Sequence, residues 1–458
     1  MTARLWTTAR LLALAVAFAP AAQAQTCAAT AIKPYIKVGS TWTNSATATV
    51  VAGNTFSFGP QPTSGGSWAW SGCGTSGSAR EQALTAKASC TATATYTNSC
   101  GAKSTQAFTL TVPGMRDLTS LQFSKLMGAG WNLGNTLEAI GGETAWGNPQ
   151  ANQALFNGLK AAGFKTVRIP VAWKQYANAD DEISARWMSR VAEVVGYAQR
   201  AGLFAMINLH WDGGWMQPTR ARQAEANRRI TRFWTQIGRR FQDHDDTLLF
   251  AGTNEVMVEG DYSPPKPEYV AVQNGFNQTF VDAVRATGGN NATRHLIVQG
   301  FNTNIDHTIA HAVMPRDTVR DRLMMEVHYY DPYEFTLDEK SAIWQWGAAA
   351  RDAKATAPWG DAAHADAQFR KMKARFIDRG IPVILGEFGA IRREDRPGAE
   401  AYRIAWNRHI ARSARAHGLV PVYWDNGVTG QHGMGLFDRR TGAQVYPELI
   451  QALLGTAT

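Results

Sequence analysis

The chain has 458 residues and a net charge of +9, from 46 basic and 37 acidic side chains. This length exceeds the size at which a single hydrophobic core stops growing, so more than one domain is expected. The basic residues are scattered and form no run that could follow a phosphate backbone, which argues against nucleic-acid binding.

Residues 1–24 have the organisation of a secretory signal peptide. Arg4 and Arg10 precede an apolar segment, 11–19, that is too short to span a bilayer. An A-x-A cleavage site at 22–24 completes the pattern. We therefore expect a protein secreted to the periplasm or the medium, with no membrane attachment after cleavage.

All four cysteines follow this peptide closely, at Cys27, Cys73, Cys90 and Cys100. In an oxidising compartment an even number indicates two disulfides, for which three pairings are possible. A zinc site is the alternative, but the segment has no C-x-x-C pair and the first histidine of the chain is His210.

Residues 25–112 predict a small all-β domain. The segment is rich in Thr, Ser, Ala and Gly, and stretches such as "TATATYTNS" alternate with period two, as short strands do. It resembles the immunoglobulin-like β-sandwich modules that accompany secreted bacterial polysaccharidases. Trp68 and Trp70 lie on one face of a predicted strand, where they would form either a platform for sugar rings or part of the core.

After a short linker, 113–117, the chain repeats one pattern to its end: an amphipathic helix, a glycine and an apolar strand. In 184–210, for example, Val191 and Val194 share a helical face, and the strand "LFAMINL" leads to His210.

Eight such strands predict a (β/α)8 barrel over 118–458. A doubly wound sheet is the alternative fold, but "GAGWNLGN" does not fit the G-x-G-x-x-G phosphate loop that such folds usually carry.

Polar and aromatic residues stand at the predicted strand ends, which converge on one mouth in a barrel. Glu255 ends the fourth strand and Glu387 the seventh, and inward side chains could bring their carboxyl groups to about 5 Å, as a retaining glycosidase requires. The full set is Asn132, Arg168, His210, Asn254, Glu255, Asn302, His328, Tyr330, Glu387 and Trp424.

The order and spacing of seven motifs resemble glycoside hydrolase family 5, the cellulase family. They are "GWNLGNTLEA", "VRIPVAW", "INLHWDGGW", "GTNEV", "EVHYYDPY", "ILGEFGA" and "VYWDNG". The resemblance covers the chain from about Leu126 to its end. One departure is Val256, which follows the Asn-Glu pair where many members have proline; it affects the turn after the strand and not Glu255.

The resemblance, together with the chemistry of the residues, implies Glu387 as the nucleophile and Glu255 as the general acid and base. Arg168 and Tyr330 are expected to favour the charged form of Glu387. Glu255 is expected to lack a close cation and to have a raised pKa. Asn254 resembles the residue that binds the sugar 2-hydroxyl.

The residues expected to bind or position the substrate are Asn132, Arg168, His210, Trp211, Asn254, His328, Tyr330 and Trp424. His210 and His328 resemble positioning residues, Trp424 resembles the floor on which the reacting sugar stacks, and Asn132 is grouped with them as a substrate-binding residue. Neither a metal nor another cofactor is expected, since two carboxylates suffice for this chemistry. Gly386 and Gly389 are interpreted as leaving room for a sugar beside Glu387.

Tryptophan is abundant, with sixteen residues. Aromatic faces along an open cleft suit β-1,4-linked glucose polymers, and Trp211 is expected to bind substrate. The tryptophans in or near predicted strand-end loops are Trp131, Trp146, Trp173, Trp211 and Trp215, and those on helix faces, expected in the core, are Trp187, Trp234 and Trp406.

The sequence therefore predicts a secreted, monomeric, retaining endo-β-1,4-glucanase that acts on β-glucan. A xyloglucan-specific endoglucanase or a β-mannanase on the same scaffold is the alternative. A barrel that binds glycan without cleaving it is a further alternative from a different class.

Overall fold

The structure is a computed structural model that describes residues 1, 27–50 and 53–455. The predicted signal peptide, apart from its first residue, lies outside the described residues. The chain divides into two compact units, an N-terminal all-β unit and a C-terminal barrel. Among the described helices, none combines the length and the apolar character needed to cross a membrane.

The N-terminal unit consists of two four-stranded sheets, in the orders β2-β1-β4-β6 and β3-β8-β7-β5. The all-β prediction is therefore confirmed. Two disulfides, Cys27–Cys100 and Cys73–Cys90, select one of the three possible pairings. The strands are β1 (Ile36–Val38), β2 (Thr41–Thr43), β3 (Thr47–Thr49), β4 (Thr55–Phe58), β5 (Gly66–Ser71), β6 (Gln82–Thr85), β7 (Cys90–Asn98) and β8 (Lys103–Thr111).

On β5, Trp68 is buried in this unit and Trp70 is half-buried. The Trp68 ring lies 4.8 Å from the Tyr96 ring, and its side chain is only 6% exposed. The Trp70 ring lies 5.9 Å from Phe58 and 5.8 Å from Phe108. Because both rings contact core aromatics, the structure favours the core interpretation over a sugar platform.

The C-terminal unit is a closed barrel of eight parallel strands, as predicted. Each strand pairs with its neighbours in chain order, and the last strand closes on the first. The strands are β9 (Gly130–Leu133), β10 (Thr166–Ile169), β11 (Phe204–Asn208), β12 (Leu248–Ala251), β13 (Leu296–Gln299), β14 (Leu323–Tyr329), β15 (Val383–Phe388) and β16 (Val420–Asp425).

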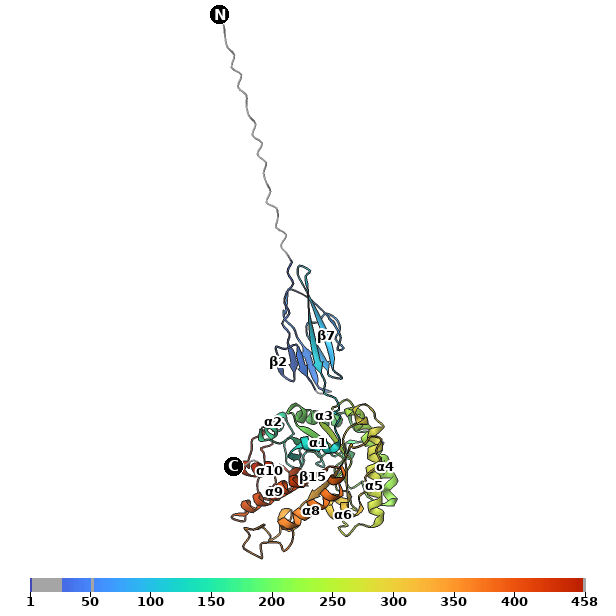
Figure 1. Ribbon diagram of the computed structural model, residues 1–458, viewed down its shortest axis with the longest axis vertical. Helices are drawn as coiled ribbons and strands as arrows, with labels where there is room; N and C mark the ends of the chain where they lie inside the picture. The colour runs from blue at the N-terminus through green and yellow to red at the C-terminus, as the bar shows by residue number, and fades with distance from the viewer. Residues whose placement is uncertain (2–26, 51–52, 456–458) are drawn as a thin grey trace. The chain divides into compact units, whose positions relative to one another are not determined.

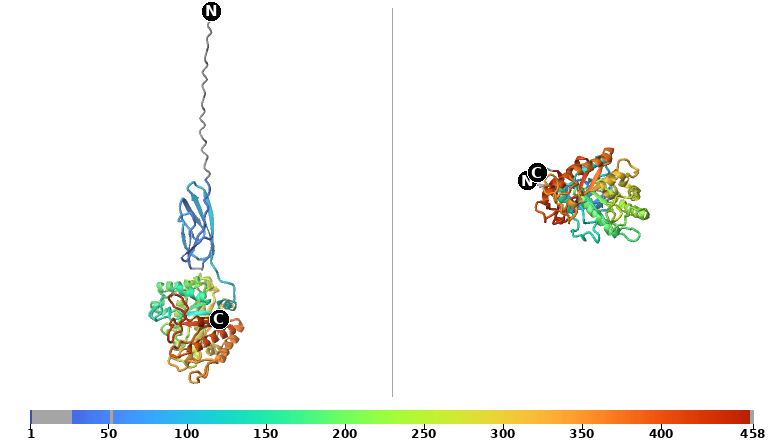
Figure 2. Two further views of the ribbon diagram at one scale, coloured as in Figure 1. Left: turned by 90° about the vertical axis from the view of Figure 1, so that its left-hand side faces the viewer. Right: turned by 90° about the horizontal axis from the view of Figure 1, so that it is seen from below.

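Helices surround this barrel, and their colours in Figure 1 and in the right-hand view of Figure 2 follow the chain around the ring. The glycine after α2, Gly163, has a left-handed backbone and ends the helix with bonds to its last turn. The helices are α1 (Ser120–Met127), α2 (Gln153–Ala162), α3 (Ala185–Arg200), α4 (Arg220–Phe241), α5 (Pro267–Arg285), α6 (Ile305–His311), α7 (Tyr333–Thr336), α8 (Ala362–Arg375), α9 (Ala399–Ala416) and α10 (Pro447–Leu454).

The barrel interior changes from apolar to polar along the strands. Near the amino ends, Leu249, Ile297 and Ile384 pack in one buried cluster with Phe123 of α1. Residues two positions further along a strand point to the same side, so the next inward layer carries polar side chains such as Gln299. The apolar end supports the barrel, and the polar end holds the candidate site.

Two tryptophans that the sequence placed near strand-end loops are core residues instead. Trp131 and Trp173 are buried, and their indole N–H groups donate to Asp425 and to the Asn208 carbonyl. Trp131 alternates with the inward residues of β9, so it points out of the barrel toward the surrounding helices. Trp146 and Trp211 are exposed, and Trp187, Trp234 and Trp406 are buried as expected.

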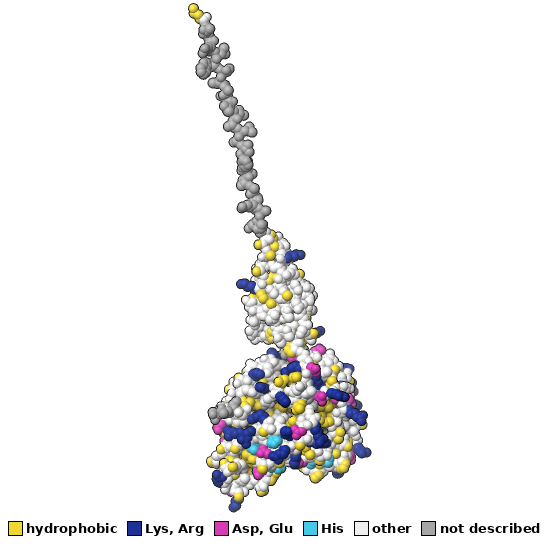
Figure 3. Space-filling view, viewed as in Figure 1, with side chains coloured by type: hydrophobic (Ala, Val, Ile, Leu, Met, Phe, Trp, Pro, Cys, Tyr) yellow, Lys and Arg dark blue, Asp and Glu magenta, His cyan; other side chains and the backbone are white. Residues whose placement is uncertain are grey.

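On the face of the barrel shown in Figure 3, Lys and Arg side chains lie among Asp and Glu side chains and do not gather in one patch. On this face the basic residues are thus part of a mixed surface, which is typical of a solvated protein.

We expect Trp68→Ala to destabilise the N-terminal unit by about 3–5 kcal/mol, because it removes a buried ring and leaves a cavity against Tyr96. Trp42→Ala is the matched control, since Trp42 is 38% exposed and should cost less. Urea unfolding followed by intrinsic fluorescence measures both. Equal stabilities for the two variants would contradict the core position of Trp68.

Candidate active site

The site lies where β14 and β15 lose their regular register. The pairing shifts between Val327 and His328, so that His328 stands opposite Glu387. An irregularity of this kind redirects side chains, and it is frequent next to functional sites. It brings a histidine and a glutamate from neighbouring strands to the same point of the mouth.

Arg168 on β10 lies at the centre of the polar layer and is buried. Its Nη1 donates to Glu387 Oε1 at 2.9 Å and to Asn132 Oδ1 at 3.0 Å. Its Nη2 donates to Asn254 Oδ1 at 2.7 Å, and its Nε lies 2.9 Å from Glu326 Oε1. One guanidinium therefore holds two carboxylates and two amides in place.

Glu326 is a member of this cluster that the sequence analysis missed. It is buried, it accepts a hydrogen bond from Gln299 Nε2 at 2.6 Å, and it lies 3.2 Å from His328 Nε2. Burial alone would raise its pKa, but Arg168, His328 and Gln299 lower that pKa to about 2. Its position two residues before His328 was the available signal, since both side chains then point into the barrel.

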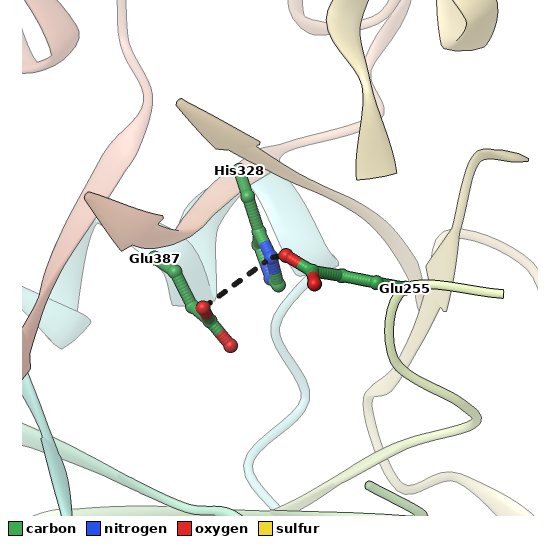
Figure 4. Close-up of side chains that lie close together, drawn as sticks. All are labelled: Glu255, His328 and Glu387. Atoms are coloured by element: carbon green, nitrogen blue, oxygen red, sulfur yellow. Dashed lines mark hydrogen bonds and ion pairs between the residues drawn. The ribbon is translucent and has the colours of Figure 1, made fainter. Parts of the chain in front are cut away.

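His328 lies between the two strand-end glutamates, as Figure 4 shows. Its Nδ1 is 2.6 Å from Glu255 Oε1 and 3.7 Å from Glu387 Oε2. Burial lowers its pKa, but the three surrounding carboxylates outweigh this effect and raise the pKa to about 9. Because both ring nitrogens already face carboxylates, we do not assign the cluster as a metal centre.

The two strand-end glutamates occupy different surroundings. A carboxylate oxygen of Glu255 and one of Glu387 lie within 4.8 Å of each other, which agrees with the expected separation of about 5 Å. The Glu387 side chain is 8% exposed, whereas that of Glu255 is 41% exposed. The Tyr330 hydroxyl donates to Glu387 Oε2 at 3.0 Å.

The structure contradicts the expectation that Glu255 has no close cation. Burial opposes ionisation of Glu255, but the hydrogen bond and charge of His328 lower its pKa. Burial raises the pKa of Glu387, and His328 and Arg168 offset only part of that effect. Both directions are opposite to those expected, because the nearby imidazole lowers the pKa of Glu255 and burial raises that of Glu387.

Asn132 lies beneath the mouth and not at its surface. It is fully buried, and its Nδ2 donates to the carbonyls of Gly386 and Tyr423 while its Oδ1 accepts from Arg168. The predicted contact with substrate does not fit this burial. Asn132 instead orients Arg168, and Arg168 itself is too deeply buried to meet a polymer directly.

The interpretation of Gly386 is also wrong. A Cβ atom at Gly386 would lie 2.1 Å from Glu326 Oε1, so the missing side chain makes room for Glu326 and not for a sugar. Gly389 lies beside Met434 and Tyr423 rather than next to an open space.

A pocket of about 510 Å³ opens beside Glu255. His210 lies on its wall, and the His210 ring stacks on Trp424 with a centroid distance of 6.0 Å and an interplanar angle of 11°. The aromatic and polar residues that line it include Trp211, Trp215, Asn254, Tyr262, Asn302, His328 and Tyr330. Of the predicted substrate-binding residues, His210, Trp211, Asn254, His328 and Tyr330 thus meet in one concave surface.

Comparison with known proteins assigns the barrel to one family. Residues 132–430 match the family model for cellulase (glycosyl hydrolase family 5). The chain is 45% identical to a xyloglucan-specific endo-β-1,4-glucanase of Bacteroides ovatus over 351 residues, 72% of this chain and 68% of that protein. It is 39% identical to endoglucanase A of Paenibacillus barcinonensis over 363 residues, 74% of this chain and 90% of that protein.

Solved structures give the same result. A Bacteroides ovatus xyloglucanase in complex with a heptasaccharide superposes with a TM-score of 0.72 at 36% identity, over 92% of this chain and 99% of that chain. A family 5 xyloglucanase from Paenibacillus pabuli superposes with a TM-score of 0.71 at 38% identity, over 73% of this chain and 99% of that chain.

We expect Gly386→Ala to lower the free energy of unfolding by about 1–3 kcal/mol, because the added methyl group overlaps Glu326. Gly430→Ala is the matched control, since no atom would lie within 4 Å of a Cβ at Gly430. Thermal unfolding measures both variants. A Gly386→Ala protein as stable as wild type would show that Glu326 is not held against this glycine.

Proposed function

Because this chain belongs to the cellulase family, glycosyl hydrolase family 5, and is a glycoside hydrolase, we propose that it cleaves internal β-1,4 bonds of a glucan with retention of configuration. One observation carries the mechanism. Glu387 is held by Arg168 and Tyr330 while its oxygen lies within 4.8 Å of an oxygen of Glu255 at an open pocket. That separation suits direct attack by one carboxylate and proton transfer by the other.

In the first step Glu387 attacks the anomeric carbon, and the glycosidic C–O bond breaks with its electron pair on the leaving oxygen. Glu255 protonates that oxygen. Arg168 and Tyr330 each engage one oxygen of Glu387, which fixes its orientation for attack. Asn254, oriented by Arg168, binds the hydroxyl next to the reacting carbon.

In the second step Glu255 removes a proton from water, and the water oxygen displaces Glu387 from the sugar. The 41% exposure of the Glu255 side chain supports this role, because water and the leaving group both have to reach it. The stacked pair of Trp424 and His210 provides a flat face for the reacting ring.

Xyloglucan is a second candidate substrate, and the pocket beside Glu255 favours it. A leaving group must lie on the side of the general acid, so this pocket receives the sugars that are released. Its volume of about 510 Å³ and its aromatic wall can accept a substituted chain. Two of the similar proteins, from Bacteroides ovatus and Paenibacillus pabuli, are xyloglucanases.

We further propose secretion and the domain boundaries expected from the sequence: 1–24 for a signal peptide, 25–112 for the β-module, 113–117 for the linker and 118–458 for the enzyme. The two disulfides support export. The linker end is attached to the barrel, because Arg116 donates to both oxygens of Asp246.

The charged groups around Glu387 argue against the alternative of a glycan-binding protein without activity. Arg168, His328 and Tyr330 all contact this one carboxylate. Burying so many ionisable groups is costly, and chemistry gives a reason for them that binding alone does not.

We expect the mature protein to release reducing ends from carboxymethylcellulose and xyloglucan, and to act much less on mannan. Glu387→Gln should reduce the rate on both glucans by at least about a thousandfold, because it removes the nucleophile without changing side-chain size. Asp245→Asn, which alters a buried carboxylate at the amino end of β12, is the matched control. A Glu387→Gln protein that cleaves as fast as wild type would refute the mechanism.

A further inference from the structure

We propose that Glu326 is a positioning residue that keeps a transferable proton on the Glu255 side of His328, so that the imidazole supplies the general acid. The inference rests on the proposed role of Glu255 as acid and base. It concerns a residue that does not touch the sugar and acts through His328.

Each ring nitrogen of His328 faces a carboxylate oxygen: Nδ1 faces Glu255 at 2.6 Å and Nε2 faces Glu326 at 3.2 Å. Ionised carboxylates only accept hydrogen bonds, so two of them can be satisfied together only by an imidazolium that donates from both nitrogens. A neutral imidazole would satisfy both only if Glu255 itself carried the proton.

These two descriptions contain the same number of protons. They differ only in the position of one proton along the short contact between His328 Nδ1 and Glu255 Oε1. Glu255 can thus be protonated by transfer of the Nδ1 proton across one hydrogen bond, and no proton has to come from solvent.

Glu326 determines which of the two ring protons of His328 is transferred. It is buried, it contacts Arg168 Nε and Gln299 Nε2, and Arg168 and His328 keep it ionised with a pKa of about 2. The permanent negative charge of Glu326 beside Nε2 keeps the proton on that nitrogen. The Nδ1 proton is then the one that leaves, and the neutral ring is left in a single tautomer.

The other groups around His328 do not hold the proton on Nε2. Glu387 on β15 lies 3.7 Å from Nδ1 and acts on the same nitrogen as Glu255. Arg168 on β10 is a fixed cation that opposes protonation of the ring. His210, after β11, has a pKa well below its usual value because of burial, and Tyr330 has one well above, so both are neutral.

The Nδ1 proton moves to Glu255 Oε1 and from there to the glycosidic oxygen, which takes the electron pair of the breaking C–O bond while Glu387 bonds to the anomeric carbon. In the second step Glu255 takes a proton from the attacking water and returns it to Nδ1. The His328 and Glu255 pair then holds one proton again.

The test is the pH dependence of kcat/KM on carboxymethylcellulose for the mature, full-length protein and its Glu326→Gln variant. Activity should be lost on the alkaline side when the pair loses its proton. Removing the charge of Glu326 weakens proton binding, so we expect this limb to move to lower pH by about one to three units. Glu326→Asp, which keeps the charge further away, should restore part of the shift.

Asp245→Asn is the control for the pH profile, because Asp245 is an equally buried carboxylate that does not face His328. The alkaline limb of the pH profile of Asp245→Asn should stay at the wild-type pH. If the limb of Glu326→Gln also stays there while its activity falls equally at every pH, Glu326 has a purely structural role and the inference is wrong.

A second readout uses 2,4-dinitrophenyl β-cellobioside, whose leaving group needs no proton. Glu326→Gln should lose at least about tenfold more activity on carboxymethylcellulose than on this glycoside. Equal losses on the two substrates would mean that Glu326 acts by orienting Arg168 toward Glu387, which would overturn the proposal.

The wild-type protein offers a measurement that does not depend on the stability of a variant. In protein with ¹⁵N-labelled histidine, the His328 ring should keep both nitrogens protonated through neutral pH and lose one near pH 9. A neutral His328 at pH 7 would refute the inference. Activity of Glu387→Gln would instead refute the proposed function, so the two failures are distinguishable.

Discussion

The ion pairs of Arg168 are the interaction on which the rest of the site depends. One buried guanidinium contacts Glu326 and Glu387 at 2.9 Å each and also orients Asn132 and Asn254. Removing one partner of such a buried pair leaves an uncompensated charge and costs about 3–5 kcal/mol. The polar end of the barrel is therefore a single cooperative unit in which a change to one charged member affects the others.

The balance of charge in this unit explains why it holds a mobile proton. Arg168 and His328 provide two cations, whereas Glu255, Glu326 and Glu387 provide three carboxylates. His328 has its pKa raised to about 9 because it lies among all three. The register shift between β14 and β15 after Val327 sets Glu387 opposite His328, so the backbone geometry brings these charged groups together.

The eight strands and the two strand-end glutamates could be predicted from the sequence, because a helix–strand repeat specifies a barrel and a barrel specifies where strand ends meet. The contacts between side chains of different strands could not be predicted from the sequence. Glu326 was missed because a glutamate inside an apolar strand shows its role only beside Arg168 and His328, and Gly386 was misread because the group that fills its space comes from β14. Trp131 looked like a cleft residue until the direction of β9 placed it among the helices.

In the proposed mechanism Arg168 and Tyr330 select Glu387, and not Glu255, as the carboxylate that bonds to the sugar. The most direct test is to trap the intermediate with 2,4-dinitrophenyl 2-deoxy-2-fluoro-β-cellobioside and to locate the label by peptide mass spectrometry. We expect one sugar per protein, attached to Glu387. A label on Glu255 or on another residue, or an active enzyme that is never labelled, would contradict it.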